Sequence, residues 1–237
     1  MSTLLPILET PYFGIFMTFL FYLIGDKLYK RWPIPIFNPL IFAIIAIIIV
    51  LLLGDIPYET FNKGGQHINL LITPATVALA IKLEKNFIYL KRYYKSILTG
   101  IVLGVLFHSV MVIGFALLFR FDGQLAATLF PKSITTAIAV GISESMGGIV
   151  SLTVATVVFT GILGALVAPS VFKWFKIDDP VAQGVALGAS SHAMGTTKAI
   201  EMGEVQGAMS SLSIVVTGIV VVIAAPIGQM VINALFN

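Results

Sequence analysis

The sequence predicts an all-α polytopic membrane protein with about six full spans and additional broken or re-entrant helices, arranged as inverted repeats in an elevator-like transporter architecture. The composition is the first indication, because 58% of the 237 residues are hydrophobic and only 11% are charged. The second is a series of apolar runs of about the length that crosses a bilayer. The third is the position of polar, proline-containing stretches between those runs. The whole chain, 1–237, is therefore predicted to form a single transmembrane domain.

Clean apolar runs alternate with interrupted ones along the chain. The first run, 12–24, lacks a basic leader and a small-residue cleavage site, so we predict a retained span and not a signal peptide. The run 36–53 predicts a second span, and 1–54 is the predicted scaffold. In the segment 64–81, Pro74 removes a helical hydrogen bond and predicts a kink or break. The later clean spans are 97–119, 149–172 and 212–236.

Short motifs recur in order and predict three repeat units, each a broken segment followed by a clean span. Thr135-Thr136 recurs as Thr196-Thr197, and Thr160-Gly161-Ile162 recurs as Thr217-Gly218-Ile219. Self-similarity by chance in Gly/Ala/Thr/Ile-rich sequence is the alternative, and the ordered series of matches favours a true repeat. The predicted units are 64–119, 124–173 and 182–236.

The basic clusters predict the topology. Lysines and arginines gather at 27–31, 82–95 and 173–176, which places these connections in the cytoplasm and both termini outside. Only one crossing then fits between Asp122 and Lys173, so 128–145 must enter the membrane and return on the same side. The same reasoning makes 186–204 re-entrant from the other side, and the second and third units are thereby inverted relative to each other.

Several classes of function are disfavoured. The absence of cysteine excludes disulfides, thiolate metal sites and a cysteine nucleophile. No HExxH, GxSxG or nucleotide-binding glycine motif is present, so we predict neither an enzyme nor a cofactor or metal site. The net charge of +3 comes from basic residues at span ends, which indicates a lipid bilayer and not nucleic acid as the partner.

The segment 186–204 is the strongest candidate for a functional site. It packs small residues, four hydroxyls, an imidazole and an ammonium between two apolar segments. Polar, irregular chain at membrane depth is tolerated only inside the protein or along a watery cavity. An ordinary loop outside the membrane is the alternative.

Three motifs carry a resemblance to a known family. ATVALA at 75–80, PKS-x-TT at 131–136 and GxSSHxxGT-x-KA at 188–199 resemble the LrgB/CidB family of bacterial membrane proteins. The similarity covers nearly the whole chain, although Ala137 stands where the family pattern has proline. The family was first described as holin-like or antiholin-like proteins affecting murein hydrolase export and lysis, and it includes plastid glycolate/glycerate and bacterial pyruvate carriers.

The resemblance implies a small monocarboxylate as substrate. It also implies that the protein lies in the cell (cytoplasmic or inner) membrane. Such an anion needs donors, which broken-helix N-termini and hydroxyls supply. Lys132 or Lys198 would then set the charge preference, or each would simply snorkel to the interface. His192 and Glu144 are candidates for proton coupling, with a buried neutral histidine and a plain loop acid as the alternatives. The predicted substrate-binding residues are Thr73, Thr76, Lys132, Ser133, Thr135, Thr136, Ser190, Ser191, His192, Gly195, Thr196, Thr197 and Lys198.

Two further expectations concern association. The Ile/Leu-dense run Ile41–Leu53 offers a smooth apolar surface, so a homodimer is expected there. The resemblance also implies a small LrgA/CidA-like membrane partner. If the chain acts mainly through such a partner or through oligomers, a holin-like or antiholin-like role replaces transport.

Overall fold

The computed structural model describes residues 10–32, 34, 37–71, 74, 77, 81, 84 and 87–236, and these residues are helical without any strand. Thr73 and Thr76, two predicted site residues, lie outside the described residues. The chain forms two compact units that divide between residues 78 and 79. Each unit is described by itself.

The first unit contains three helices. These are α2 (Pro11–Arg31), α3 (Pro39–Leu53) and α4 (Tyr58–Asn69). Helix α2 packs against both of the others. Glycines make the close contacts possible: a Cβ atom on Gly14 would meet the Phe61 carbonyl oxygen of α4, and one on Gly25 would lie 2.9 Å from Cα of Pro39 in α3. The α2–α4 contact is therefore backbone against backbone.

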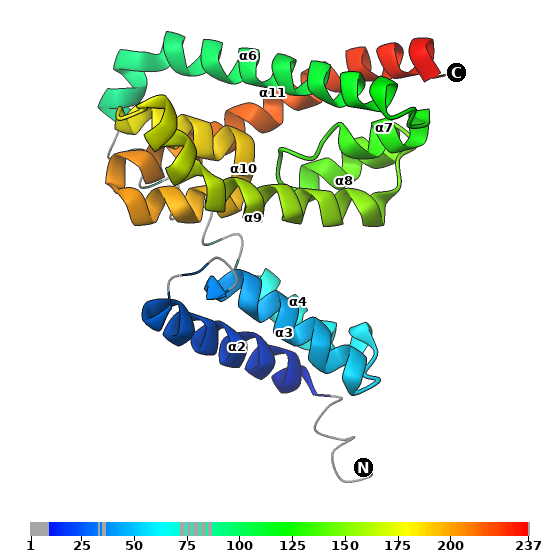
Figure 1. Ribbon diagram of the computed structural model, residues 1–237, viewed down its shortest axis with the longest axis vertical. Coiled ribbons are helices and arrows are strands. Elements are labelled where there is room, and N and C mark those ends of the chain that lie inside the picture. The colour runs from blue at the N-terminus through cyan, green and yellow to red at the C-terminus, as the bar shows by residue number, and fades with distance from the viewer. Residues whose placement is uncertain are drawn as a thin grey trace. The chain divides into compact units, whose positions relative to one another are not determined.

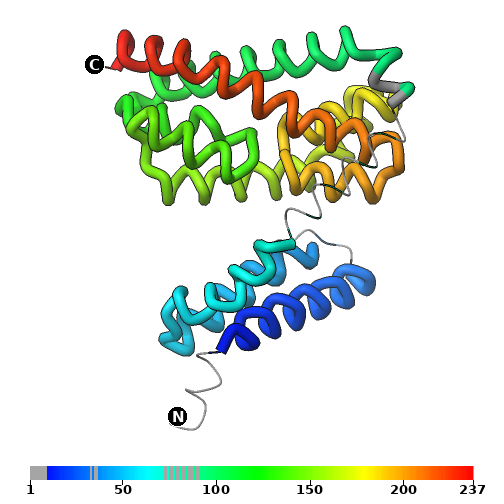
Figure 2. The backbone as a smooth tube through the Cα atoms, turned by 180° about the vertical axis from the view of Figure 1, so that it is seen from behind, coloured from blue at the N-terminus to red at the C-terminus, as the bar shows by residue number. Residues whose placement is uncertain are grey.

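The second unit contains three long helices around shorter ones. Figure 1 shows α6 and α9 on opposite sides, with α7, α8 and α10 between them, and Figure 2 shows α11 running obliquely across the back. The helices are α6 (Phe87–Leu118), α7 (Gly123–Leu129), α8 (Thr136–Ser145), α9 (Val150–Phe175), α10 (Pro180–Met202) and α11 (Glu204–Phe236).

Among the described residues, three helices are long and apolar enough to cross a membrane. By length and hydropathy these are 91–118, 150–175 and 204–236, while the apolar helix α3 has only 15 residues. A bilayer core requires about 20 apolar residues in a helix. The described residues therefore show an all-helical protein of the membrane type. The number of six full spans stays a prediction.

The segment α7–α8 forms a helical hairpin. Asp122 caps the start of α7 by accepting the Leu125 N–H at 2.7 Å, and the chain leaves helical geometry over 130–135 before α8 begins. Asp122 and Gly147, at the two open ends, line one cavity of about 330 Å³. The two legs therefore lie side by side, with 130–135 as the tip.

Helix α10 forms a second hairpin because its backbone turns at His192. This residue has φ 41° and ψ −129°, in the positive-φ region that non-glycine residues rarely adopt. A Cβ atom on Gly195 would meet the Leu187 carbonyl oxygen, so the two legs touch directly. Both legs also contact Ser210 of α11, through Gly188 and through Thr196. The chain thus doubles back, with His192 at the tip.

The two hairpins occupy opposite ends of the long helices. The α10 legs pack on Gln206 to Ser210 of α11, whereas the α7–α8 hairpin reaches Gly218 and Gly228. The open end of α7–α8 adjoins Phe236, and the open end of α10 leads directly into α11. The tips therefore point toward the middle of α11 from opposite directions. Both breaks lie within the segments that the sequence predicted to be broken.

The hairpin geometry gives a test that uses one substitution at two sites. Gly195→Ala should destabilise the protein by about 1–3 kcal/mol, because the added methyl group overpacks the α10 legs. Gly104→Ala in α6 meets no atom within 4 Å and should stabilise the protein by about 0.5–1 kcal/mol through helix propensity. Thermal unfolding of both variants in detergent measures the difference, and equal melting temperatures would contradict the hairpin.

Candidate functional site

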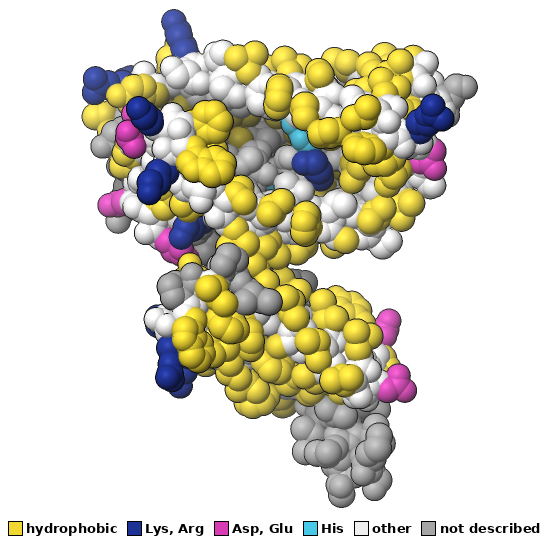
Figure 3. Space-filling view, in the orientation of Figure 1, with side chains coloured by type: hydrophobic (Ala, Val, Ile, Leu, Met, Phe, Trp, Pro, Cys, Tyr) yellow, Lys and Arg dark blue, Asp and Glu magenta, His cyan; other side chains and the backbone are white. Residues whose placement is uncertain are grey.

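The candidate site lies where the two hairpin tips approach the three long helices. Each long helix contacts one of the hairpins: α6 through His108, α9 through Val157 and Gly161, and α11 through Gly218. Figure 3 shows a histidine and a basic side chain inside a hollow of the second unit, bordered by hydrophobic side chains. Polar groups are thus gathered inside an otherwise apolar unit.

The first tip is held by His108 of α6. Its Nε2 lies 3.0 Å from the Phe130 carbonyl oxygen, and its Nδ1 faces the Ser133 hydroxyl at 3.5 Å. Because a carbonyl only accepts, Nε2 carries the hydrogen. In the neutral imidazole Nδ1 is then an acceptor, toward which Ser133 directs its hydrogen.

The first tip also carries positive charge. Lys132 is partly buried and acts electrostatically on His108. No ion pair involves Lys132 among the residues that the structure describes. Helix α8 starts four residues later, at Thr136, and the side chain of its N-cap residue, Thr135, makes no capping hydrogen bond. The N–H groups of the first turn, Thr136 included, add the partial positive charge of a helix N-terminus.

The second tip is attached to α9. His192 is only 5% exposed, and its Nε2 lies 3.0 Å from the Val157 carbonyl oxygen. A Cβ atom on Gly161 would lie 2.5 Å from the imidazole Cε1, so this glycine makes room for the ring. The contact offsets a backbone conformation that costs on the order of 1–3 kcal/mol. This geometry matches the alternative of a buried, hydrogen-bonded histidine.

The hydroxyls of α10 bond mainly within the protein. Thr196, which is buried, donates to the His192 carbonyl at 3.0 Å and contacts the Ser210 hydroxyl at 2.8 Å. Ser191 is fully buried and lies 3.1 Å from the exposed Ser190 hydroxyl. Thr197 is exposed and bonds only to its own helix. Burial and internal hydrogen bonds thus give Ser191 and Thr196 a positioning role.

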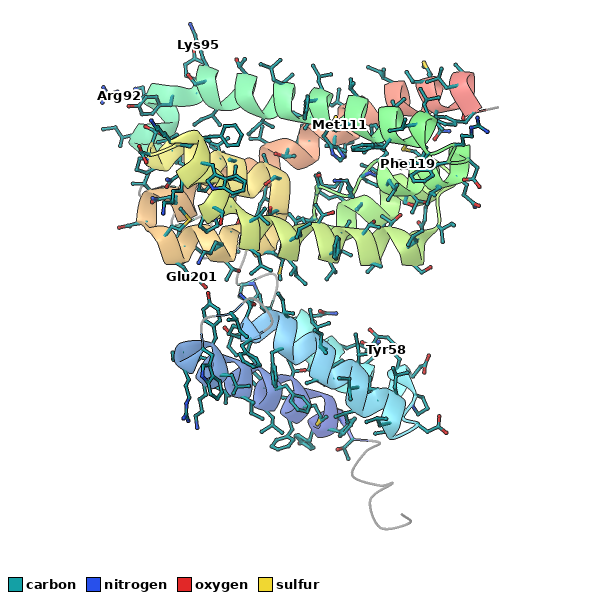
Figure 4. All side chains as sticks on the ribbon, viewed as in Figure 1. Tyr58, Arg92, Lys95, Met111, Phe119 and Glu201 are labelled. Carbon is teal, nitrogen blue, oxygen red and sulfur yellow. The ribbon has the colours of Figure 1, made fainter. Side chains whose placement is uncertain are left out.

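Two predicted charged residues lie away from the tips. The Lys198 ammonium donates to a Glu201 carboxylate oxygen at 3.0 Å, on the leg that leads to the open end of α10. Figure 4 shows Glu201 at the edge of the second unit. Glu144 is exposed in the last turn of α8, at the open end of the other hairpin. The structure therefore brings Lys132, and not these two residues, to the tips.

Buried hydroxyls join the first hairpin to α9. Ser143 and Thr153 lie 2.7 Å apart, and Thr153 also contacts the Thr128 carbonyl at 3.0 Å. Thr128 accepts the Ile149 N–H at 2.8 Å. All three side chains are fully buried, so the cluster fixes the legs of the hairpin and is not available to a ligand.

Two residues of this region, His108 and Thr217, are not among the site residues predicted from the sequence. His108 is the one ionisable residue in the apolar run 97–119, and such a residue at membrane depth is a functional candidate by default. Thr217 belongs to the repeated Thr-Gly-Ile motif, but only the fold shows that its hydroxyl is buried.

Comparison with known proteins gives one family. The sequence model of the LrgB-like family matches residues 18–230. The antiholin-like protein LrgB of Bacillus mycoides (strain KBAB4) is 38% identical over 218 residues, which cover 92% of this chain and 95% of that protein. The antiholin-like protein LrgB of Bacillus anthracis (strain CDC 684 / NRRL 3495) matches equally well.

No solved structure matches the chain. The family match confirms the resemblance seen in the motifs. With the three bilayer-length helices, it also confirms the predicted membrane localisation. The prediction that the chain is not an enzyme is confirmed by the same family match.

The internal hydrogen bonds of α10 predict different effects at adjacent threonines. Thr196→Val should cost about 1–3 kcal/mol, because it leaves the Ser210 hydroxyl without its cross-helix partner. Thr197→Val removes an exposed hydroxyl and should change stability by less than about 0.5 kcal/mol. Detergent-solubilised thermal melts measure both. If Thr197→Val is the more damaging change, the assignment of Thr196 as a packing residue fails.

Proposed function

This chain belongs to the LrgB-like family, and we propose that it carries small monocarboxylate anions, such as pyruvate, glycolate or lactate, across the membrane. The substrate site lies between the two hairpin tips. Inverted re-entrant hairpins that meet near the bilayer midplane are the arrangement found in many secondary transporters. Lys132, Ser133, Thr135 and Thr136 on the first tip are the proposed anion contacts.

The observation that carries this proposal is the unpaired positive charge at the first tip. A partly buried ammonium is costly at membrane depth unless an anion accompanies it. Glu201 balances Lys198, but no carboxylate among the described residues balances Lys132. The α8 N-terminus belongs to the same tip and lacks a side-chain cap, so its N–H groups are a second partner for a carboxylate. The Ser133 hydroxyl supplies a further contact.

The second hairpin has a different role in this proposal. His192, Ser191, Gly195 and Thr196 shape and fix the second tip through contacts within the protein. The exposed Ser190 and Thr197 are the hydroxyls of this hairpin that remain most accessible. Thr73 and Thr76, from the first predicted repeat, remain proposed contacts by analogy with the other two copies.

The proposed mechanism is alternating access of the elevator type. The helices that follow the two hairpins are long and apolar, so we propose that the hairpins and these helices shift together. The first two predicted spans, 1–54, are the proposed static scaffold, and the run Ile41–Leu53 is the proposed homodimer contact. Its helix, α3, exposes aliphatic side chains including Ile48 and Leu52. His192 and Glu144 are the candidates for proton coupling. His192 is buried at the second tip, and Glu144 is exposed at the open end of the first hairpin.

An antiholin-like role is the second candidate, and the names of the relatives favour it. In that role the chain would act on cell lysis through oligomers or through a small LrgA/CidA-like membrane partner. The transport role needs a polar site between the tips, whereas the antiholin-like role needs only association surfaces. The two candidates therefore make different predictions for substitutions at the first tip.

Lys132→Gln should lower the uptake of radiolabelled pyruvate, glycolate and lactate at least about tenfold, because the anion loses its charged partner. Lys198→Gln is the matched control: the same charge is removed from a lysine already paired with Glu201, and uptake should fall less than about twofold. Both variants are measured in proteoliposomes that contain this chain alone.

The result also separates the two candidate functions. If the purified chain moves none of the three acids, while adding an LrgA/CidA-like partner protein alters lysis in cells, the antiholin-like role replaces the carrier. If Lys198→Gln abolishes uptake and Lys132→Gln does not, the anion site belongs to the second hairpin.

A further inference from the structure

One buried hydroxyl of the second unit has no partner. Thr217 of α11 is only 1% exposed, and its Oγ1 forms no hydrogen bond with any described residue. Other buried hydroxyls on the same helix are bonded: Ser211 donates to the Gly207 carbonyl at 2.7 Å and Ser213 to the Met209 carbonyl at 2.8 Å. Because an unsatisfied buried hydroxyl is costly, its presence needs an explanation.

Thr217 lies at the boundary between the two hairpins. One side of this boundary is Ser210, seven residues earlier on α11, which contacts Gly188 and Thr196 of the α10 hairpin. The other side is the adjacent Gly218. A Cβ atom added at Gly218 would lie 2.9 Å from Cδ1 of Ile138, which belongs to the first turn of α8. The unpartnered hydroxyl is therefore buried at the level where the tips converge.

The chemistry of this hydroxyl differs from that of the first tip. Lys132 and the α8 N-terminus offer charge and donors, which suit the carboxylate of a substrate. A threonine hydroxyl is neutral and both donates and accepts, so it suits a neutral oxygen. In a small 2-oxo or 2-hydroxy acid, that oxygen is bonded to the carbon next to the carboxylate.

We infer that Thr217 is a specificity-determining residue whose hydroxyl bonds the oxygen on carbon 2 of the substrate. The inference rests on the proposed function and assigns to Thr217 the selection of acids that carry an oxygen on carbon 2 over acids that lack it. A site built to bond a substrate oxygen discriminates against the analogue that lacks it, because the site's own polar group is then left unpaired. Acetate and propionate are accordingly poor substrates relative to glycolate and pyruvate.

The test is Thr217→Val, which replaces the hydroxyl with a methyl group of similar size. Competition of unlabelled acids against labelled pyruvate uptake in proteoliposomes gives the preference for glycolate over acetate and for pyruvate over propionate. Each preference should fall roughly tenfold, the equivalent of about 1.4 kcal/mol and of one hydrogen bond. Thr217→Ser, which keeps the hydroxyl, should retain most of both preferences.

The melting temperature is an independent measurement, because loss of this hydroxyl is not expected to lower it. Thr217→Val should leave it unchanged or raise it, because no bond to the protein is lost. Thr153→Val is the matched control: it loses bonds to Ser143 and to the Thr128 carbonyl, so it should melt lower yet keep the wild-type preferences.

Each outcome has one meaning. A wild-type chain that carries none of these acids overturns the proposed function, and the inference with it. Uptake with preferences that survive Thr217→Val overturns the inference alone. A marked loss of melting temperature in Thr217→Val also overturns it, since the hydroxyl would then have a structural partner.

Discussion

The arrangement of the second unit depends on two histidine-to-carbonyl hydrogen bonds, one at each hairpin tip. A helix that breaks inside an apolar environment frees backbone groups that water cannot satisfy. His108 of α6 bonds the Phe130 carbonyl at the first break, and His192 at the second break bonds the Val157 carbonyl of α9, both at 3.0 Å. Each bond ties a tip to a long helix.

Small residues also hold the second hairpin against the long helices. Gly161 makes room for the His192 ring, Gly195 lets the α10 legs touch, and Gly188 brings α10 against the Ser210 backbone of α11. With little hydrophobic driving force between helices in lipid, close backbone approach and interhelical hydrogen bonds supply the cohesion. Thr196 to Ser210 is one such bond. Buried residues of the motif at 188–199 thus serve packing.

The helix breaks could be predicted from the sequence, because proline, glycine and paired threonines indicate them locally and the pattern recurs. The local pair of Lys198 and Glu201 was also predictable from a spacing of three residues. The contact of His108 with Ser133 was not, since it joins residues 25 positions apart and depends on how α6 packs on the tip. Equally, no local pattern tells that Thr196 is buried while Thr197 is exposed.

The two hairpins differ in chemistry, and this difference bears on how the proposed site holds a ligand with one charged end. The first tip offers an ammonium without an ion-pair partner among the described residues, and a helix N-terminus without a side-chain cap. The second offers a histidine already bonded to α9. A monocarboxylate has one charged end and one neutral end, so a site with charge on one side matches it in a single orientation. In the proposed carrier, binding energy would therefore come mainly from the first hairpin. The second hairpin would contact the neutral end of the anion, where no second charge has to be desolvated.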